Sequence, residues 1–258
     1  MRAVATVKVA DKSYAVDAVV FDKDGTLVDF HLLWGGRVLG ACDALVQKAG
    51  GGKQLSRALL RTLGYDQDAG KIHGNSPFAC SPMAKLDTIA AAVLFQHGFP
   101  WGEAEKLVQE SFAPGARGAL SPSPAAVKPL ADLPKLFAAL TAAGLQVAVA
   151  TSDDRAPTEA ALAQLGVGGA AQLVQLVVCG DDGLPAKPSP LLLLEIAGRL
   201  GVAVDKVMVV GDTAADLRMA ADAGAVAVGV LSGAGSHDDI APFAHVVAAD
   251  INHISATV

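Results

Sequence analysis

The chain has 258 residues, 52% of them hydrophobic and 18% charged, and a formal net charge of −6 at pH 7. This apolar fraction excludes a disordered chain, because it is large enough to offset the conformational entropy lost on folding. We expect no nucleic-acid partner, since no run of lysines or arginines could follow a phosphate backbone.

The cysteines and the apolar segments bear on the cellular location. Cys42, Cys80 and Cys179 lie far apart without a CxxC spacing, which favours reduced thiols over a disulfide framework. The N-terminus reaches Lys8 before any apolar run long enough for a signal peptide. Residues 160–180 lack charge, but their glutamines and glycines would be costly in hydrocarbon. We therefore expect a cytoplasmic monomer or homodimer with no membrane span.

The first buried strand is expected at Ala18–Asp22, directly before Lys23 and Asp24. A short hairpin around Asp11-Lys12 precedes it and is expected to extend the core sheet at its start. The second strand is expected only at residue 146. A crossover in a parallel sheet needs about 10–12 residues, so most of this interval is interpreted as an insertion.

The insertion has a helical pattern. Helices are expected over residues 37–49, 55–63, 82–97 and 103–112. Ser81 is the expected N-cap of the third helix and Gly98 ends it. The proline-rich segment 120–129 is expected to lead back to the core. We therefore predict a helical cap at 31–126, on an α/β core made of 1–30 and 127–258.

From residue 146 onward, short apolar runs alternate with stretches long enough for helices. The runs are 147–150, 173–178, 207–210, 226–230 and 245–247. Continuous apolar runs are typical of strands covered on both faces. Ser189-Pro190 and Gly201 are expected to bound one intervening helix, and Thr213 and Gly224 another. This order predicts a doubly wound parallel sheet.

Polar residues follow the expected strands. Asp22 and Asp24 end the first strand, and Thr151 and Ser152 end the second. Asp212 ends the 207–210 strand, Asp216 follows one helical turn later, and Lys187 lies in the loop after the 173–178 strand. In an open α/β sheet, ligands bind beyond the carboxyl ends of the strands. These side chains are therefore expected to share one crevice.

Aspartates gathered in one crevice repel each other unless a hard cation lies between them. Carboxylate oxygens with space for several waters are typical of a magnesium site. We therefore predict that Mg²⁺ draws Asp22 and Asp212 together, and that a phosphate group completes its coordination.

These residues also carry a family resemblance. DKDGT at 22–26, VAVATS ending in Ser152, Lys187 in AKPSP and Asp212 in GDTAAD resemble the four motifs of haloacid dehalogenase-like (HAD) phosphohydrolases. All four occur in the family's order, and the similarity spans residues 18 to about 250. The resemblance implies a HAD-type core carrying a cap. The insertion directly follows the first motif. This insertion point resembles that of the subgroup that contains phosphoglycolate phosphatase and β-phosphoglucomutase.

The resemblance implies that Asp22 attacks phosphorus and forms an aspartyl-phosphate. Asp24 would protonate the leaving alkoxide and then accept a proton from water. Thr151, Ser152 and Lys187 would bind the phosphoryl oxygens.

The resemblance also implies the metal ligands. Asp22, the backbone carbonyl of Asp24 and Asp212 would bind Mg²⁺, and Asp216 would support them through water or Lys187. Gly25 would permit the tight turn after Asp24.

The implied function is hydrolysis of a small phosphomonoester, with phosphoglycolate as one candidate. A phosphomutase of the same fold remains an alternative, and so does a non-catalytic phospho-aspartate signalling module, although such modules lack a large insertion. Dehalogenation is disfavoured because dehalogenating members lack a carboxylic acid at the position of Asp24.

Within the insertion, the polar loop at residues 71–81 could overhang the crevice and select substrates. His31 and Trp34 follow the first motif and either face the crevice or pack against each other. His73 and Asn75 are further candidates in the loop.

Overall fold

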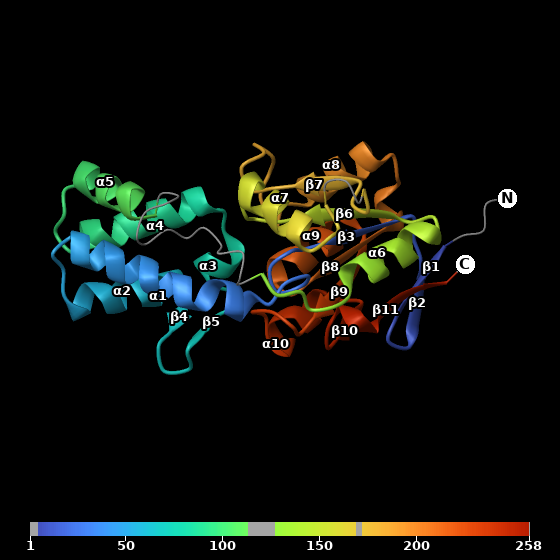
Figure 1. The fold of residues 1–258 in the computed structure, drawn as a ribbon, viewed down its shortest axis with the longest axis horizontal. Coiled ribbons are helices and arrows are strands. Elements are labelled where there is room, and N and C mark those ends of the chain that lie inside the picture. The colour runs from blue at the N-terminus through green and yellow to red at the C-terminus, as the bar shows by residue number, and fades with distance from the viewer. Residues whose placement is uncertain (1–4, 113–126, 169–171, 258) are drawn as a thin grey trace.

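The computed structural model describes residues 5–112, 127–168 and 172–257. Its centre is a parallel sheet with the strand order β10-β9-β8-β3-β6-β7 (Figure 1). The strands are β3 (Ala18–Phe21), β6 (Gln146–Ala150), β7 (Leu176–Val178), β8 (Val207–Gly211), β9 (Val226–Val230) and β10 (Val246–Ala248). All pairings between neighbouring strands are parallel. The predicted doubly wound α/β core is confirmed, although β7 is shorter than its apolar run.

Helices cover both faces of this sheet. They are α6 (Leu133–Ala142), α7 (Arg155–Gln164), α8 (Pro190–Leu200), α9 (Ala214–Ala223) and α10 (His237–Ile240), with 3₁₀ turns at Val204–Lys206, Ala241–Phe243 and Ile251–His253. Strand β3 shows the two layers. Phe21 stacks on Phe137 of α6, with ring centroids 5.1 Å apart, whereas Val20 belongs to the apolar cluster that contains α8 and α9. The continuous apolar pattern of the strands follows from this two-sided burial.

The predicted helix boundaries in the core are also confirmed. Ser189 is the N-cap residue of α8, and Gly201 ends that helix in the left-handed conformation. Thr213 and Asp216 form a capping box at the start of α9, which ends at the left-handed Gly224.

The expected N-terminal hairpin forms, but it does not extend the core sheet. Strands β1 (Thr6–Val9) and β2 (Lys12–Ala15) join β11 (Ile254–Thr257) in a separate antiparallel sheet with the order β11-β1-β2. The expectation was wrong because both edges of β3 are already paired, with β6 and with β8. The last strand of the chain supplies the partner for β1 instead.

A group of helices lies beyond one end of the sheet (Figure 1). Between β3 and β6 the chain forms α1 (Phe30–Lys48), α2 (Lys53–Leu63), β4 (Tyr65–Asp66), β5 (Lys71–Ile72), α3 (Pro77–Cys80), α4 (Met83–Gln96) and α5 (Trp101–Phe112). We call this group, residues 30–112, the helical insertion. It confirms an α/β core with an inserted helical cap, whereas the boundaries 31 and 126 stay a prediction.

Two details of the insertion differ from expectation. Helix α1 begins at Phe30 rather than at residue 37, because the Asp29 carboxylate accepts a hydrogen bond from the Leu32 N–H at 3.0 Å. Ser81 is not the N-cap of α4. It ends α3, and Pro82 precedes α4 instead. Most of the expected linker, up to residue 126, lies outside the described residues.

Among the described residues, no helix combines the length and the apolar character needed to cross a membrane.

Candidate active site

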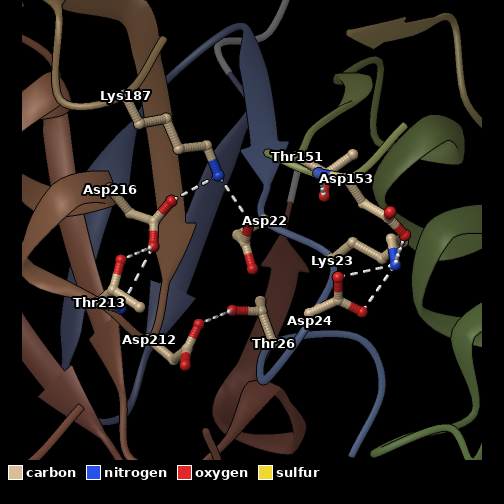
Figure 2. Close-up of polar contacts among 10 residues, drawn as sticks. All are labelled: Asp22, Lys23, Asp24, Thr26, Thr151, Asp153, Lys187, Asp212, Thr213 and Asp216. Atoms are coloured by element: carbon tan, nitrogen blue, oxygen red, sulfur yellow. Dashed lines mark hydrogen bonds and ion pairs between the residues drawn. The ribbon is translucent and has the colours of Figure 1, made fainter. Parts of the chain in front are cut away.

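Side chains from four strand ends meet where the sheet faces the helical insertion (Figure 2). Asp22 follows β3, Thr151 follows β6, Asp212 follows β8, and Lys187 comes from the loop between β7 and α8. A cavity of about 50 Å³ is lined by Asp22, Asp24, Thr151, Ser152, Lys187 and Asp216. The predicted site residues are therefore gathered in one place, with Asp212 in the adjoining carboxylate cluster.

Lys187 connects two of the carboxylates. Its Nζ lies 2.6 Å from Asp22 Oδ1 and 2.6 Å from Asp216 Oδ1. The other oxygen of Asp216 accepts a hydrogen bond from the Thr213 hydroxyl at 2.6 Å. Both oxygens of Asp216 thus have partners, which suits the expected supporting role.

Asp22, Asp212 and Asp216 form a buried cluster in which one carboxylate oxygen from each lies within 4.8 Å of the others. Burial raises the pKa of Asp22 to about 7, against the opposing effect of Lys187. Burial, together with Asp22 and Asp216, also raises the pKa of Asp212 well above its usual value. Three carboxylates share one ammonium here, so a bound cation would relieve the remaining repulsion. Clustered carboxylate oxygens are suitable ligands for Mg²⁺.

Asp212 is held on several sides. Its Oδ2 accepts a hydrogen bond from the Ala234 N–H at 2.8 Å, and its Oδ1 accepts one from the Thr26 hydroxyl at 3.4 Å. Gly25 has a φ of +95°, and a Cβ there would lie 2.3 Å from Asp212 Oδ2. The turn after Asp24 therefore requires glycine both for its backbone conformation and for its approach to Asp212.

Asp24 belongs to a second ionic group. Lys23 Nζ lies 2.6 Å from Asp24 Oδ1 and 3.0 Å from Asp153 Oδ2. Burial raises the pKa of Asp24, although Lys23 lowers it. Lys23 and Asp153 were not predicted as site residues. Each had a signal in the sequence: Lys23 lies inside the first motif, and Asp153 directly follows Ser152.

The helical insertion supplies the other wall of the cavity. Phe30, Trp34 and residues 78–81 line it, together with Met83 and Leu86 of α4. The end of the 71–81 loop thus lies on the cavity wall, and so does Trp34, whereas substrate selection by this loop stays a prediction. His31, His73 and Asn75 do not line this cavity; they line a different one, between the insertion and the loop after β9.

Comparison with known proteins shows which family the chain resembles. Residues 16–224 match the family of haloacid dehalogenase-like hydrolases. The chain is 30% identical over 231 residues to a phosphoglycolate phosphatase from Rhodospirillum rubrum, a match that covers 87% of this chain and 83% of that protein. A phosphoglycolate phosphatase from Pectobacterium atrosepticum is 33% identical over 97 residues, which cover 38% of this chain and 40% of that protein.

The fold is also found among solved structures. A HAD phosphatase from Thermococcus onnurineus has a TM-score of 0.60 and 21% identity, covering 92% of this chain and 94% of that one. The family match over residues 16–224, together with the relative from Rhodospirillum rubrum, shows that this protein belongs to the haloacid dehalogenase-like hydrolase family.

Proposed function

We propose that this hydrolase is a Mg²⁺-dependent phosphatase, which cleaves a small phosphomonoester through an aspartyl-phosphate on Asp22. One observation carries the proposal. Asp22 lies at the cavity with its Oδ1 2.6 Å from the Lys187 ammonium, and it belongs to the buried carboxylate cluster with Asp212 and Asp216. A cationic group beside a nucleophilic carboxylate favours the approach of an anionic phosphoryl group.

Asp22, the backbone carbonyl of Asp24 and Asp212 would hold the metal ion. When bound, Mg²⁺ would offset the repulsion between the carboxylates and neutralise charge on the phosphoryl oxygens. Asp216 would support this set by fixing Lys187, with which it shares a contact of 2.6 Å.

In the first step, an oxygen of Asp22 forms a bond to phosphorus while the bond from phosphorus to the leaving oxygen breaks. Asp24 gives its proton to the leaving alkoxide. In the second step, Asp24 takes a proton from water, the water oxygen bonds to phosphorus, and the bond to Asp22 breaks. The raised pKa of Asp24 supports its role as the acid, because it keeps the proton available closer to neutral pH.

The phosphoryl oxygens would be bound by Thr151, Ser152 and Lys187, all of which line the cavity. The Thr151 hydroxyl oxygen accepts a hydrogen bond from the Asp153 N–H at 3.1 Å, which orients this hydroxyl at the end of β6. Lys187 would compensate the charge that develops in the transition state.

The relatives named above suggest phosphoglycolate as the first substrate to test. We also propose that residues 31–126 act as the cap that covers the substrate, because the insertion forms one wall of the cavity. Cys42, Cys80 and Cys179 are free thiols, which supports the proposed cytoplasmic location.

The test uses the purified protein and p-nitrophenyl phosphate. We expect phosphate release that requires Mg²⁺, stops with EDTA and returns on adding Mg²⁺. Asp22→Asn should lose turnover while keeping the wild-type circular dichroism spectrum. Turnover retained in Asp22→Asn would refute the assigned nucleophile. A sugar phosphate that isomerises without releasing phosphate would favour the phosphomutase alternative.

A further inference from the structure

The loop between β9 and α10, residues 231–236, lies between the carboxylate cluster and the helical insertion. On one side it contacts the carboxylate cluster. The Ala234 N–H donates to Asp212 Oδ2 at 2.8 Å. Gly233 and Gly235 pack so closely that an added Cβ would lie 1.9 Å from Asp212 Oδ2 and 2.1 Å from the Asp212 carbonyl oxygen, respectively. This loop thus fixes both the side chain and the backbone of Asp212.

The same loop also holds the turn of the first motif. The Ser232 hydroxyl donates to the Gly25 carbonyl oxygen at 2.7 Å. The Gly25 N–H donates to the Val28 carbonyl at 2.8 Å, and this N–H shares its peptide plane with the Asp24 carbonyl. The peptide group before Gly25 is therefore held by Val28 within the turn, and the peptide group after Gly25 is held by Ser232 of the loop.

On its other side, the loop touches the helical insertion. Gly74 lies against it, since an added Cβ would be 2.6 Å from Gly235 Cα and 2.7 Å from the Ala234 carbonyl oxygen. Asn75 Nδ2 donates to Asp239 Oδ1 at 2.6 Å, at the first turn of α10. The second oxygen of Asp239 accepts a hydrogen bond from the Ser236 hydroxyl at 2.6 Å. One carboxylate thus joins the insertion to the end of the loop.

The insertion connects this contact to the cavity wall. Cys80, which lines the cavity beside Asp22, has its Sγ 3.0 Å from the Gly74 carbonyl oxygen. A continuous path of contacts therefore runs from the wall of the cavity, through Gly74 and the loop, to Asp212.

We propose that the 231–236 loop is a positioning element that couples docking of Gly74 and Asn75 to the geometry of Asp212 and of the Asp24–Gly25 turn. Groups that hydrogen-bond to metal ligands set the orientation of those ligands, and their loss typically lowers metal affinity by about 10–100-fold. Contact with the insertion would thus order the ligands before the metal binds. The metal part of this proposal rests on the proposed function, whereas the coupling between Asn75 and Asp212 does not.

The coupling is tested first without metal, by hydrogen exchange of the Ala234 amide, which donates to Asp212. Asn75→Ala removes the contact of the insertion with Asp239. Asn252→Ala is the matched control, because Asn252 also donates through its side-chain amide, to the Leu130 carbonyl at 3.0 Å, outside the site. We expect exchange at Ala234 to become at least about fivefold faster in Asn75→Ala and to stay at the wild-type rate in Asn252→Ala.

An unchanged rate at Ala234 in a folded Asn75→Ala protein would overturn the coupling. An equal acceleration in Asn252→Ala would also overturn it, since the effect would then be one of general destabilisation.

The second measurement is Mg²⁺ affinity by isothermal titration calorimetry without substrate. We expect the Kd to rise about tenfold or more in Ser232→Ala and about threefold in Asn75→Ala, with no change in Asn252→Ala. Wild-type affinity in Ser232→Ala and Asn75→Ala would overturn the positioning role of the loop. If the wild-type protein binds no Mg²⁺, the proposed function and the metal part of the proposal fail, while the exchange measurement still decides the coupling.

Discussion

Lys23 and Asp24, adjacent in the sequence, form a buried ion pair in which Lys23 Nζ lies 2.6 Å from Asp24 Oδ1. Lys23 also lies 3.0 Å from Asp153 Oδ2, and none of its surface is exposed. This arrangement sets the charge of the group that we propose as acid and base. Burial raises the pKa of Asp24, and the ammonium of Lys23 limits that rise.

We therefore predict that Lys23→Met raises the pKa of Asp24 further. More Asp24 would then be protonated at neutral pH in the aspartyl-phosphate form, and unable to accept the proton of water in the second step. The kcat at pH 7 should fall by roughly tenfold or more, and the acidic limb of its pH profile should move to higher pH. Turnover of p-nitrophenyl phosphate between pH 5 and 9 measures both effects.

Two further variants separate chemistry from folding. Removing one partner of a buried ion pair typically costs about 3–5 kcal/mol, so Lys23→Met is compared with Lys23→Met/Asp153→Asn, which removes a carboxylate as well. Lys23→Arg keeps the positive charge. An acidic limb that stays in place in folded Lys23→Met would contradict the assigned effect of Lys23 on Asp24.

Gly25 gives a second prediction. Gly25→Ala would combine strain at a φ of +95° with a Cβ only 2.3 Å from Asp212 Oδ2. Gly183→Ala is the matched control, because Gly183 has a φ of +72° and an added Cβ would meet no atom within 4 Å. We expect backbone strain to lower the free energy of unfolding of both variants by about 1–2 kcal/mol. Only Gly25→Ala should lose Mg²⁺ binding in addition. Thermal unfolding and calorimetry measure the two losses, and equal Mg²⁺ affinity in both variants would refute the role of the close approach.

Lys187 gives a third prediction. Lys187→Met leaves Asp22 and Asp216 without the ammonium that lies 2.6 Å from each of them. We expect the metal-free protein to lose about 3–5 kcal/mol of stability, because two buried carboxylates lose the positive charge that pairs with them. Added Mg²⁺ should restore part of this stability, whereas turnover should stay reduced by about 10²-fold or more. Urea unfolding with and without Mg²⁺ checks the first effect, and wild-type turnover with Mg²⁺ would contradict the second.

The sequence was sufficient to predict the core and the clustering of the site. The apolar runs of β3, β6 and β8 continue without polar interruption because both faces of these strands are buried. Since parallel strands end at the same edge, the polar residues that follow them had to meet there.

Other features depend on contacts that no local pattern encodes. Strand β1 pairs with β11, at the opposite end of the chain, and Asn75 contacts Asp239, 164 positions away. Lys23 has the charge of a surface residue, and only the approach of Asp24 and Asp153 explains its burial. The first two features follow from how the termini and the insertion pack, whereas the burial of Lys23 follows from the neighbouring ends of β3 and β6.

The carboxylates at the site give a final prediction, on the pH dependence of stability. Burial raises the pKa values of Asp22, Asp24 and Asp212 in the folded protein above those of the unfolded chain. The folded form therefore binds more protons, so its stability must fall as pH rises from about 4 through 7, where Asp22 titrates. Carboxyls with lowered pKa values, such as Asp182 and Asp239, change stability only below this range.

We expect the metal-free protein, kept in EDTA, to melt at least about 4 °C higher at pH 5 than at pH 7.5, since about 1 kcal/mol shifts the Tm of a chain this size by roughly 2–4 °C. Mg²⁺ should reverse the order, because it binds the deprotonated carboxylates and competes with protons. Asp212→Asn removes one of the raised groups, so it should flatten the metal-free profile and abolish the stabilisation by Mg²⁺. A metal-free Tm that is higher at pH 7.5 than at pH 5 would show that these carboxylates are not held in an environment that disfavours their charge.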